Sequence, residues 1–147
     1  IHLIYCGDGP EIKKLREEVM LNQLNGCVSI LGNIKPENIS EYYKMSDVFV
    51  FPSYMEGMPN AVMEAMACGL PTVCTSVGGL TYELNNSKGA ILVPPHNDDK
   101  LYNAMINIIE NASLRTEMAV NARREAERKF EINKKVSELN NLLHKLI

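Results

Sequence analysis

Two carboxylates near the middle of the chain, Glu56 and Glu64, have seven residues between them. Glu56 lies in a stretch bracketed by prolines, and Glu64 lies among strong helix formers in segment 61–68. A helix N-terminus favours phosphate, and a carboxylate one turn further along can accept hydrogen bonds from a sugar diol. A carboxylate on the approaching loop could hold a second sugar. The alternative is an ordinary loop charge and a surface helix residue, and spacing alone favours that alternative.

The residues around these acids predict a strand, a loop, a helix and a second strand. The apolar run 48–51 precedes the acids, and the strand-like run 72–75 follows them. Asn60 is expected to cap the helix, and Gly69 is expected to end it.

The same alternation runs along the whole chain. Further strands are expected at 3–6, 28–31 and 90–93, the first of them buried on both faces. Further helices are expected from Ile12 to about Asn25, at 36–45, around 82–84, after a cap at Asn97, at 114–129 and at 132–146, the last with Val136, Leu139, Leu143 and Leu146 in line. This pattern predicts one α/β domain with an open, doubly wound parallel sheet.

Ligands of such sheets lie beyond the carboxyl ends of the strands. Six of the nine glycines follow expected strands at that edge, where a close backbone contact needs room: Gly7, Gly9, Gly32, Gly57, Gly78 and Gly79. The sheet's ligand is therefore expected there.

Composition and missing motifs exclude several other functions. A net charge of -3 without a basic stripe argues against nucleic acid as a partner. Ile12 stands where a dinucleotide fingerprint needs its third glycine, and neither a phosphate-binding loop ending in Gly-Lys-Ser/Thr nor a nucleophilic serine elbow occurs. His2, His96 and His144 lack metal-ligand spacing. We therefore expect no nicotinamide cofactor and no metal.

Localisation follows from cysteine usage and hydropathy. Cys6, Cys27, Cys68 and Cys74 form no Cys-x-x-Cys pair, which indicates reduced thiols in a cytoplasmic protein. No apolar run approaches the ~20 residues that span a bilayer. The basic cluster within 123–129 is interleaved with glutamates, which is typical of a solvated helix face; a peripheral contact with anionic lipid is the alternative.

Segment 56–71 resembles the signature of the GT-B glycosyltransferases of family four, also called group 1 glycosyl transferases; it reads Glu-Gly-Met-Pro-Asn-Ala-Val-Met-Glu-Ala-Met-Ala-Cys-Gly-Leu-Pro. Further matches follow in order at 7–10, 32–34, 47–53 and 78–79. Members are retaining enzymes that use nucleotide-diphosphate sugars. The resemblance implies that residues 1–147 are a Rossmann-like donor-binding domain, the C-terminal domain of a GT-B fold.

The resemblance also implies roles for individual residues. Glu56 would be the catalytic residue that contacts the donor sugar, and Glu64 would hold the ribose hydroxyls. The diphosphate would lie on backbone N–H groups of Gly57, Met58 and Asn60. The base would lie against Gly32, Asn33 and Ile34, and Gly7, Asp8, Gly9, Gly78 and Gly79 would line the cleft. Pro59 lacks an N–H that many relatives have, and Glu83 comes one place later than the family's glutamate.

The family's N-terminal acceptor domain would precede Ile1. We therefore expect this chain to be a piece of a longer protein, without that domain. The Arg and Lys that neutralise the leaving diphosphate, and the first strand of the domain, would also lie there. The full-length protein is expected to be a hexosyltransferase-type enzyme without a cofactor. This chain alone is expected to bind donor with a dissociation constant nearer ~1 mM than ~1 µM and to transfer no sugar.

The missing strand has a structural consequence. We expect strands 3–6 and 48–51 either to pair directly or to leave an edge at which a second copy associates.

Three functions stay open. The leading one is the donor-binding domain of a cytoplasmic transferase that builds a bacterial surface polysaccharide or glycolipid, with association with a membrane as the alternative to a purely cytoplasmic location. The second is a non-catalytic nucleotide-sugar-binding module. The third is another GT-B enzyme, such as a sugar-nucleotide epimerase or a phosphorylase, and the paired Glu56 and Glu64 weigh against it.

Overall fold

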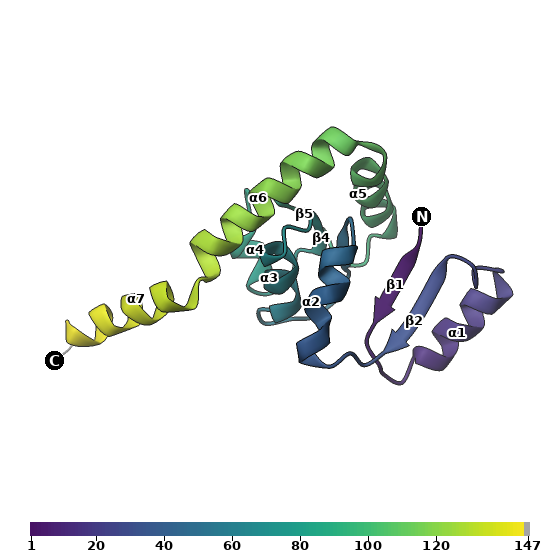
Figure 1. The fold of residues 1–147 in the computed structure, drawn as a ribbon, viewed down its shortest axis with the longest axis horizontal. Coiled ribbons are helices and arrows are strands. Elements are labelled where there is room, and N and C mark those ends of the chain that lie inside the picture. The colour runs from purple at the N-terminus through teal and green to yellow at the C-terminus, as the bar shows by residue number, and fades with distance from the viewer. Residues whose placement is uncertain (146–147) are drawn as a thin grey trace. The chain divides into compact units, whose positions relative to one another are not determined.

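The structure, a computed structural model, describes residues 1–145 and divides into two compact units (Figure 1). The first unit is Ile1–Ile39, and the second begins at Ser40. Helix α2 (Pro36–Met45) contains the boundary.

The first unit is built around a strand–helix–strand motif. Strand β1 (Leu3–Cys6) pairs in parallel with β2 (Val28–Gly32), and helix α1 (Ile12–Leu21) forms the crossover that parallel strands require. Leu3 and Tyr5 remain 48% and 40% exposed. The prediction that this strand is buried on both faces is therefore wrong.

The second unit holds a three-stranded parallel sheet in the order β3 (Phe49–Phe51), β4 (Thr72–Thr75), β5 (Ala90–Val93). Its helices are α3 (Asn60–Ala67), α4 (Leu80–Glu83), α5 (Asp98–Glu110), α6 (Ala112–Phe130) and α7 (Ile132–His144).

Central strand β4 shows that this sheet is covered on both faces. All four of its residues are buried. Neighbouring Val73 and Cys74, whose side chains point to opposite faces, belong to two different core clusters. Cys74 packs with Val62 and Met66 of α3, whereas Val73 packs with Ile108 of α5. The predicted doubly wound α/β arrangement is thereby confirmed for this sheet.

Strand pairing within each unit is parallel. The first unit holds the sheet β1–β2, and the second holds the sheet β3–β4–β5. Direct pairing of strands 3–6 and 48–51 would join the two units, so it stays a prediction. Association of a second copy at a free edge also stays a prediction.

Most expected elements occur with the expected bounds. The strands at 3–6, 72–75 and 90–93 and the helix at 36–45 match, and Asn97 caps α5 by accepting a hydrogen bond from Lys100 N at 2.9 Å. In α7, the aligned side chains of Val136, Leu139 and Leu143 stay about half exposed. Leu146 lies outside the described residues.

The bounds of α3 correct one prediction and confirm another. Pro59, not Asn60, occupies the N-cap position, in an extended conformation without a side-chain cap. Asn60 is the first helical residue instead, because the ψ of 121° at Pro59 is extended and places that residue outside the helix. Gly69 ends the helix as predicted, with a φ of +78°. Its N–H donates to Met66 O at 2.9 Å, and Leu70 N–H donates to Ala65 O at 3.0 Å, which is the Schellman arrangement.

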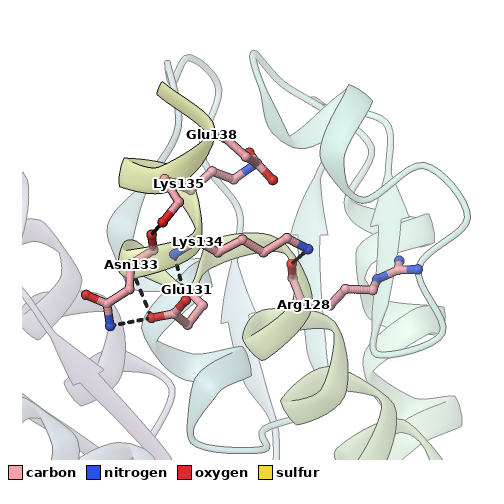
Figure 2. A network of polar contacts seen from close by, with 7 residues as sticks. Arg128, Glu131, Asn133, Lys134, Lys135 and Glu138 are labelled. Atoms are coloured by element: carbon pink, nitrogen blue, oxygen red, sulfur yellow. Dashed lines mark hydrogen bonds and ion pairs between the residues drawn. The ribbon is translucent and has the colours of Figure 1, made fainter. Parts of the chain in front are cut away.

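The junction between α6 and α7 is organised by Glu131, whose carboxylate caps α7 (Figure 2). Oε2 accepts from Lys134 N at 2.8 Å, and Oε1 accepts from Asn133 N at 3.0 Å and Asn133 Nδ2 at 2.8 Å. Lys134 Nζ donates to Arg128 O at 3.3 Å. The bonds from the backbone N–H groups of Lys134 and Asn133 lower the pKa of Glu131 below its ordinary value.

The cap predicts a pH dependence of α7. Because the folded pKa of Glu131 is lowered, its stabilisation of the helix is fully present above the ordinary glutamate pKa and is lost as the pH falls through the lowered value. NMR titration of the Glu131 carboxyl, with Cα shifts of 132–136 as a measure of helicity, should show a midpoint below that of free glutamate and a parallel loss of helicity. Glu131→Gln should remove this pH dependence, and Glu138→Gln should leave it. A midpoint at or above the free value would contradict the prediction.

Gly89, the residue before β5, packs against α6 so closely that we expect no side chain to fit there. A Cβ added there would lie 2.4 Å from both N and Cα of Ala122. Gly89→Ala should therefore lower the free energy of unfolding by about 1–3 kcal/mol, as overpacking does, measured by urea denaturation. The control is Gly26→Ala, where a Cβ meets nothing within 4 Å. Equal stabilities of the two variants would contradict this packing.

Candidate functional site

Two loops meet at the carboxyl edge of the three-stranded sheet, and they contain five of the predicted site residues, Met58 among them. The loop after β3 carries Glu56 and Gly57, and the loop after β4 carries Gly78 and Gly79. The Gly79 N–H donates to Gly57 O at 2.7 Å. A Cβ at Gly78, whose φ is +51°, would lie 2.0 Å from Glu56 O. Only glycine allows this approach, so a close backbone contact explains the glycine at position 78 on the predicted edge of the sheet.

Glu56 is held by contacts that begin on the central strand. Thr75, the last residue of β4, donates its hydroxyl to Ser53 O. The Ser53 hydroxyl in turn donates to Glu56 Oε1 at 3.0 Å. Glu56 is half-buried. An ionised carboxylate accepts about four hydrogen bonds, so Glu56 keeps acceptor capacity for ligand hydroxyls.

Backbone N–H groups at the start of α3 are open to an anion. The helix has no side-chain cap, and Val62 N–H turns back to Pro59 O at 3.2 Å. Within residues 1–145, the N–H groups of Gly57, Met58 and Asn60 donate to no protein acceptor. These are the three donors predicted to hold a diphosphate, and with the helix dipole they suit that charge.

Glu64 lies on α3 with an exposed side chain, and a tyrosine orients it. Tyr43 of α2 donates its hydroxyl to Glu64 Oε2 at 3.2 Å. The Tyr43 ring is buried and packs edge-on against Phe49 of β3, with centroids 5.6 Å apart. The sequence does not single out Tyr43, because this contact joins two helices and belongs to no local motif.

A cavity of about 360 Å³ adjoins two of the predicted residues, Met58 and Gly79, and neither Glu56 nor Glu64 lines it. The other lining residues are Met63, Tyr82, Glu83, Lys129, Phe130 and Lys135. Its walls are mainly apolar, and its rim carries two lysines. The sequence does not predict this cavity.

The basic cluster within 123–129 lies on an exposed helix face, as predicted, because Arg123, Arg124 and Arg128 are exposed; two of its cations also bond to other helices. The Arg123 guanidinium donates to Ala67 O at the end of α3, and it pairs with Glu127 at 2.6 Å. Lys129 Nζ donates to Glu83 O at the end of α4. Cations at helix C-termini satisfy the last carbonyls and favour the dipole, so these two residues connect α6 to α3 and α4.

The remaining predicted residues lie in the first unit. Gly7 N–H donates to Gly32 O at 2.7 Å, and Asp8 Oδ1 accepts from Gly9 N at 2.8 Å. Gly7 and Gly32 have φ values of +145° and +73°. Asn33 and Ile34 follow Gly32 in the segment before α2. The site residues thus form two clusters, each within its own unit.

The cysteines are free thiols, and burial raises the pKa of Cys74 to about 12. Cys74 is therefore a protonated core residue rather than a nucleophile. Residues 1–145 contain no group of three or more His, Cys, Asp and Glu that could hold a metal ion. None of the helices described in the structure has the length and apolar character needed to cross a membrane.

Comparisons with known proteins agree with this architecture. The family model "Glycosyl transferases group 1" matches residues 1–125. The chain is 32% identical over 140 residues to the Escherichia coli UDP-Gal:alpha-D-GlcNAc-diphosphoundecaprenol alpha-1,3-galactosyltransferase, covering 95% of this chain and 35% of the relative. It is 27% identical over 136 residues to the putative teichuronic acid biosynthesis glycosyltransferase TuaC of Bacillus subtilis, covering 92% and 33%.

Solved structures share the fold. Sucrose-phosphate synthase of Thermosynechococcus elongatus superposes with a TM-score of 0.86 at 28% identity, covering 99% of this chain and 38% of that one. Anabaena HepE, solved in complex with UDP, gives a TM-score of 0.89 at 23% identity, covering 99% and 41%. The chain spans about a third of the length of these curated relatives. It belongs to the group 1 glycosyl transferases, and its Rossmann-like α/β fold is that of the GT-B enzymes.

Proposed function

We propose that this chain is the donor-binding part of a retaining, hexosyltransferase-type enzyme. The enzyme moves a sugar from a nucleotide-diphosphate sugar to a glycan or glycolipid acceptor. One observation carries the proposal: three unpartnered N–H groups, of Gly57, Met58 and Asn60, lie between two fixed acids at the start of α3. The names of the E. coli and B. subtilis relatives support a nucleotide-sugar donor and a role in polysaccharide synthesis.

Each group at the start of α3 has a role that follows from its chemistry. The N–H groups and the helix dipole bind the diphosphate. Glu64, with one oxygen on Tyr43, accepts hydrogen bonds from the ribose hydroxyls through its other oxygen. Glu56, fixed by Ser53, accepts hydrogen bonds from the donor sugar. Gly78 keeps the Glu56 loop in place because its backbone packs directly on it.

The transfer step leaves negative charge on the departing nucleoside diphosphate. Preorganised dipoles that face this charge lower the barrier, because they need no reorganisation as it develops. Backbone N–H groups supply these dipoles in the second unit. Donor binding is therefore the part of the reaction that we propose for these groups.

Titration with nucleoside diphosphates tests the donor site. Adding UDP or GDP to the ¹⁵N-labelled chain should shift the amide signals of 57–64, with a dissociation constant near ~1 mM. ATP serves as the control nucleotide, with a longer phosphate chain and a different base. No shifts at millimolar ligand, or shifts confined to other segments, would refute the proposal.

Substitution of the ribose-binding acid tests its role. Glu64→Gln should weaken binding of the preferred nucleotide roughly 10- to 100-fold, because a hydrogen bond to a charged group contributes about 1.5–3 kcal/mol. The glutamine keeps an acceptor for Tyr43, so the thermal midpoint should change little. The control is Glu110→Gln at the end of α5, an exposed helical glutamate in the same unit. Equal affinities of the two variants would remove Glu64 from the site.

A further inference from the structure

Tyr54 and His96 form a stacked pair at the carboxyl edge of the three-stranded sheet. Their ring centroids are 4.2 Å apart and their planes differ by 9°. Tyr54 lies in the loop after β3, two positions before Glu56, and His96 follows β5. Strand β4 separates β3 from β5 in the sheet. The stack therefore joins the loops of two strands that are not neighbours.

Core burial does not account for this contact. Tyr54 is 63% exposed, and His96 is also exposed. His96 has a φ of +57°, in the left-handed region that residues other than glycine rarely adopt. Such a conformation persists where the surrounding structure determines it, and it is found most often at functional sites. Here the chain turns at His96 between Pro95 and the α5 cap at Asn97, and this turn presents the imidazole to Tyr54.

The stack completes the attachment of the Glu56 loop. Ser53 O is bonded to Thr75 on one side of Glu56, and Gly57 O is bonded to Gly79 on the other. Tyr54 lies between these two backbone attachments, and its ring contact with His96 is the one that reaches β5. Within residues 54–56, Met55 O and Glu56 Oε1 accept from the Ser53 hydroxyl of the same loop at 3.3 and 3.0 Å, and the stack adds a contact to another loop.

We infer that the Tyr54–His96 stack is a positioning pair that fixes Glu56 for the donor sugar. This inference rests on the proposed donor-binding function. Neither ring contacts the reacting atoms; both act through the loop conformation. The effect depends on a flat ring at each position and not on the tyrosine hydroxyl.

The test removes the stack from either side while keeping the backbone. His96→Asn loses the ring but keeps a residue that tolerates the left-handed conformation. Tyr54→Leu loses the other ring, and Tyr54→Phe retains a stacking ring. The control is Tyr102→Leu, an exposed tyrosine on α5. Because both stacked residues are exposed, unfolding in urea should confirm that every variant folds.

Two readouts follow from the structure. The Gly79 amide donates to Gly57 O, so its hydrogen exchange reports how often the Glu56 loop detaches. The binding of UDP-glucose and of UDP, followed by NMR, separates the sugar from the nucleotide. His96→Asn and Tyr54→Leu should each speed Gly79 exchange roughly 2- to 12-fold, the factor expected for an aromatic pair, and weaken UDP-glucose more than UDP. Tyr54→Phe and the control should match the unmodified chain.

A double variant decides between positioning and direct contact. If the stack is the cause, His96→Asn combined with Tyr54→Leu should be no worse than either alone. Additive losses, unchanged Gly79 exchange, or a loss of UDP-glucose binding with Tyr54→Leu but not with His96→Asn would overturn the inference. If the unmodified chain binds neither ligand, the proposed function fails, and the exchange measurement still tests the stack by itself.

Discussion

The backbone of Gly78 lies against the carbonyl groups of Glu56 and Gly57, and this contact fixes the site in the second unit. It brings the loop after β3 to the loop after β4 and allows the Gly79 N–H to reach Gly57 O. A side chain at position 78 would force these loops apart, because its Cβ would overlap Glu56 O. The loop that carries Glu56 and the free N–H groups before α3 therefore keeps its orientation only because residue 78 is a glycine.

Much of this edge could be predicted from the sequence because its causes are local. Apolar runs identified the strands, and the close backbone approach of Gly78 and Gly79 to the loop after β3 explains why glycines stand at those two positions. The cap of α3 could not be predicted so well. Asn60 has the better capping side chain, but the buried Pro59 before it takes the N-cap position and leaves the helix without a side-chain cap. The N–H groups there remain open for that reason.

Contacts between distant elements were beyond prediction from one sequence. Tyr43 reaches Glu64 from another helix, and Lys129 bonds to the end of α4. Their positions along the chain show only that Tyr43 belongs to an amphipathic helix and Lys129 to a charged one. Strand pairing is of the same kind: the apolar run at 3–6 identifies a strand but not its partners. Within the first unit it pairs with β2, and Leu3 and Tyr5 are partly exposed.

Two cations of the second unit serve its packing. Lys129 and Arg123 both donate to carbonyls at helix C-termini. They hold α6 against α3 and α4, and their charge faces the negative ends of those helix dipoles. The N–H groups at the opposite end of α3 keep their positive partial charge free, and they can neither lose a proton nor move with a side chain. Fixed dipoles of this kind suit a site that binds a negatively charged ligand, because they need no reorganisation when the ligand arrives.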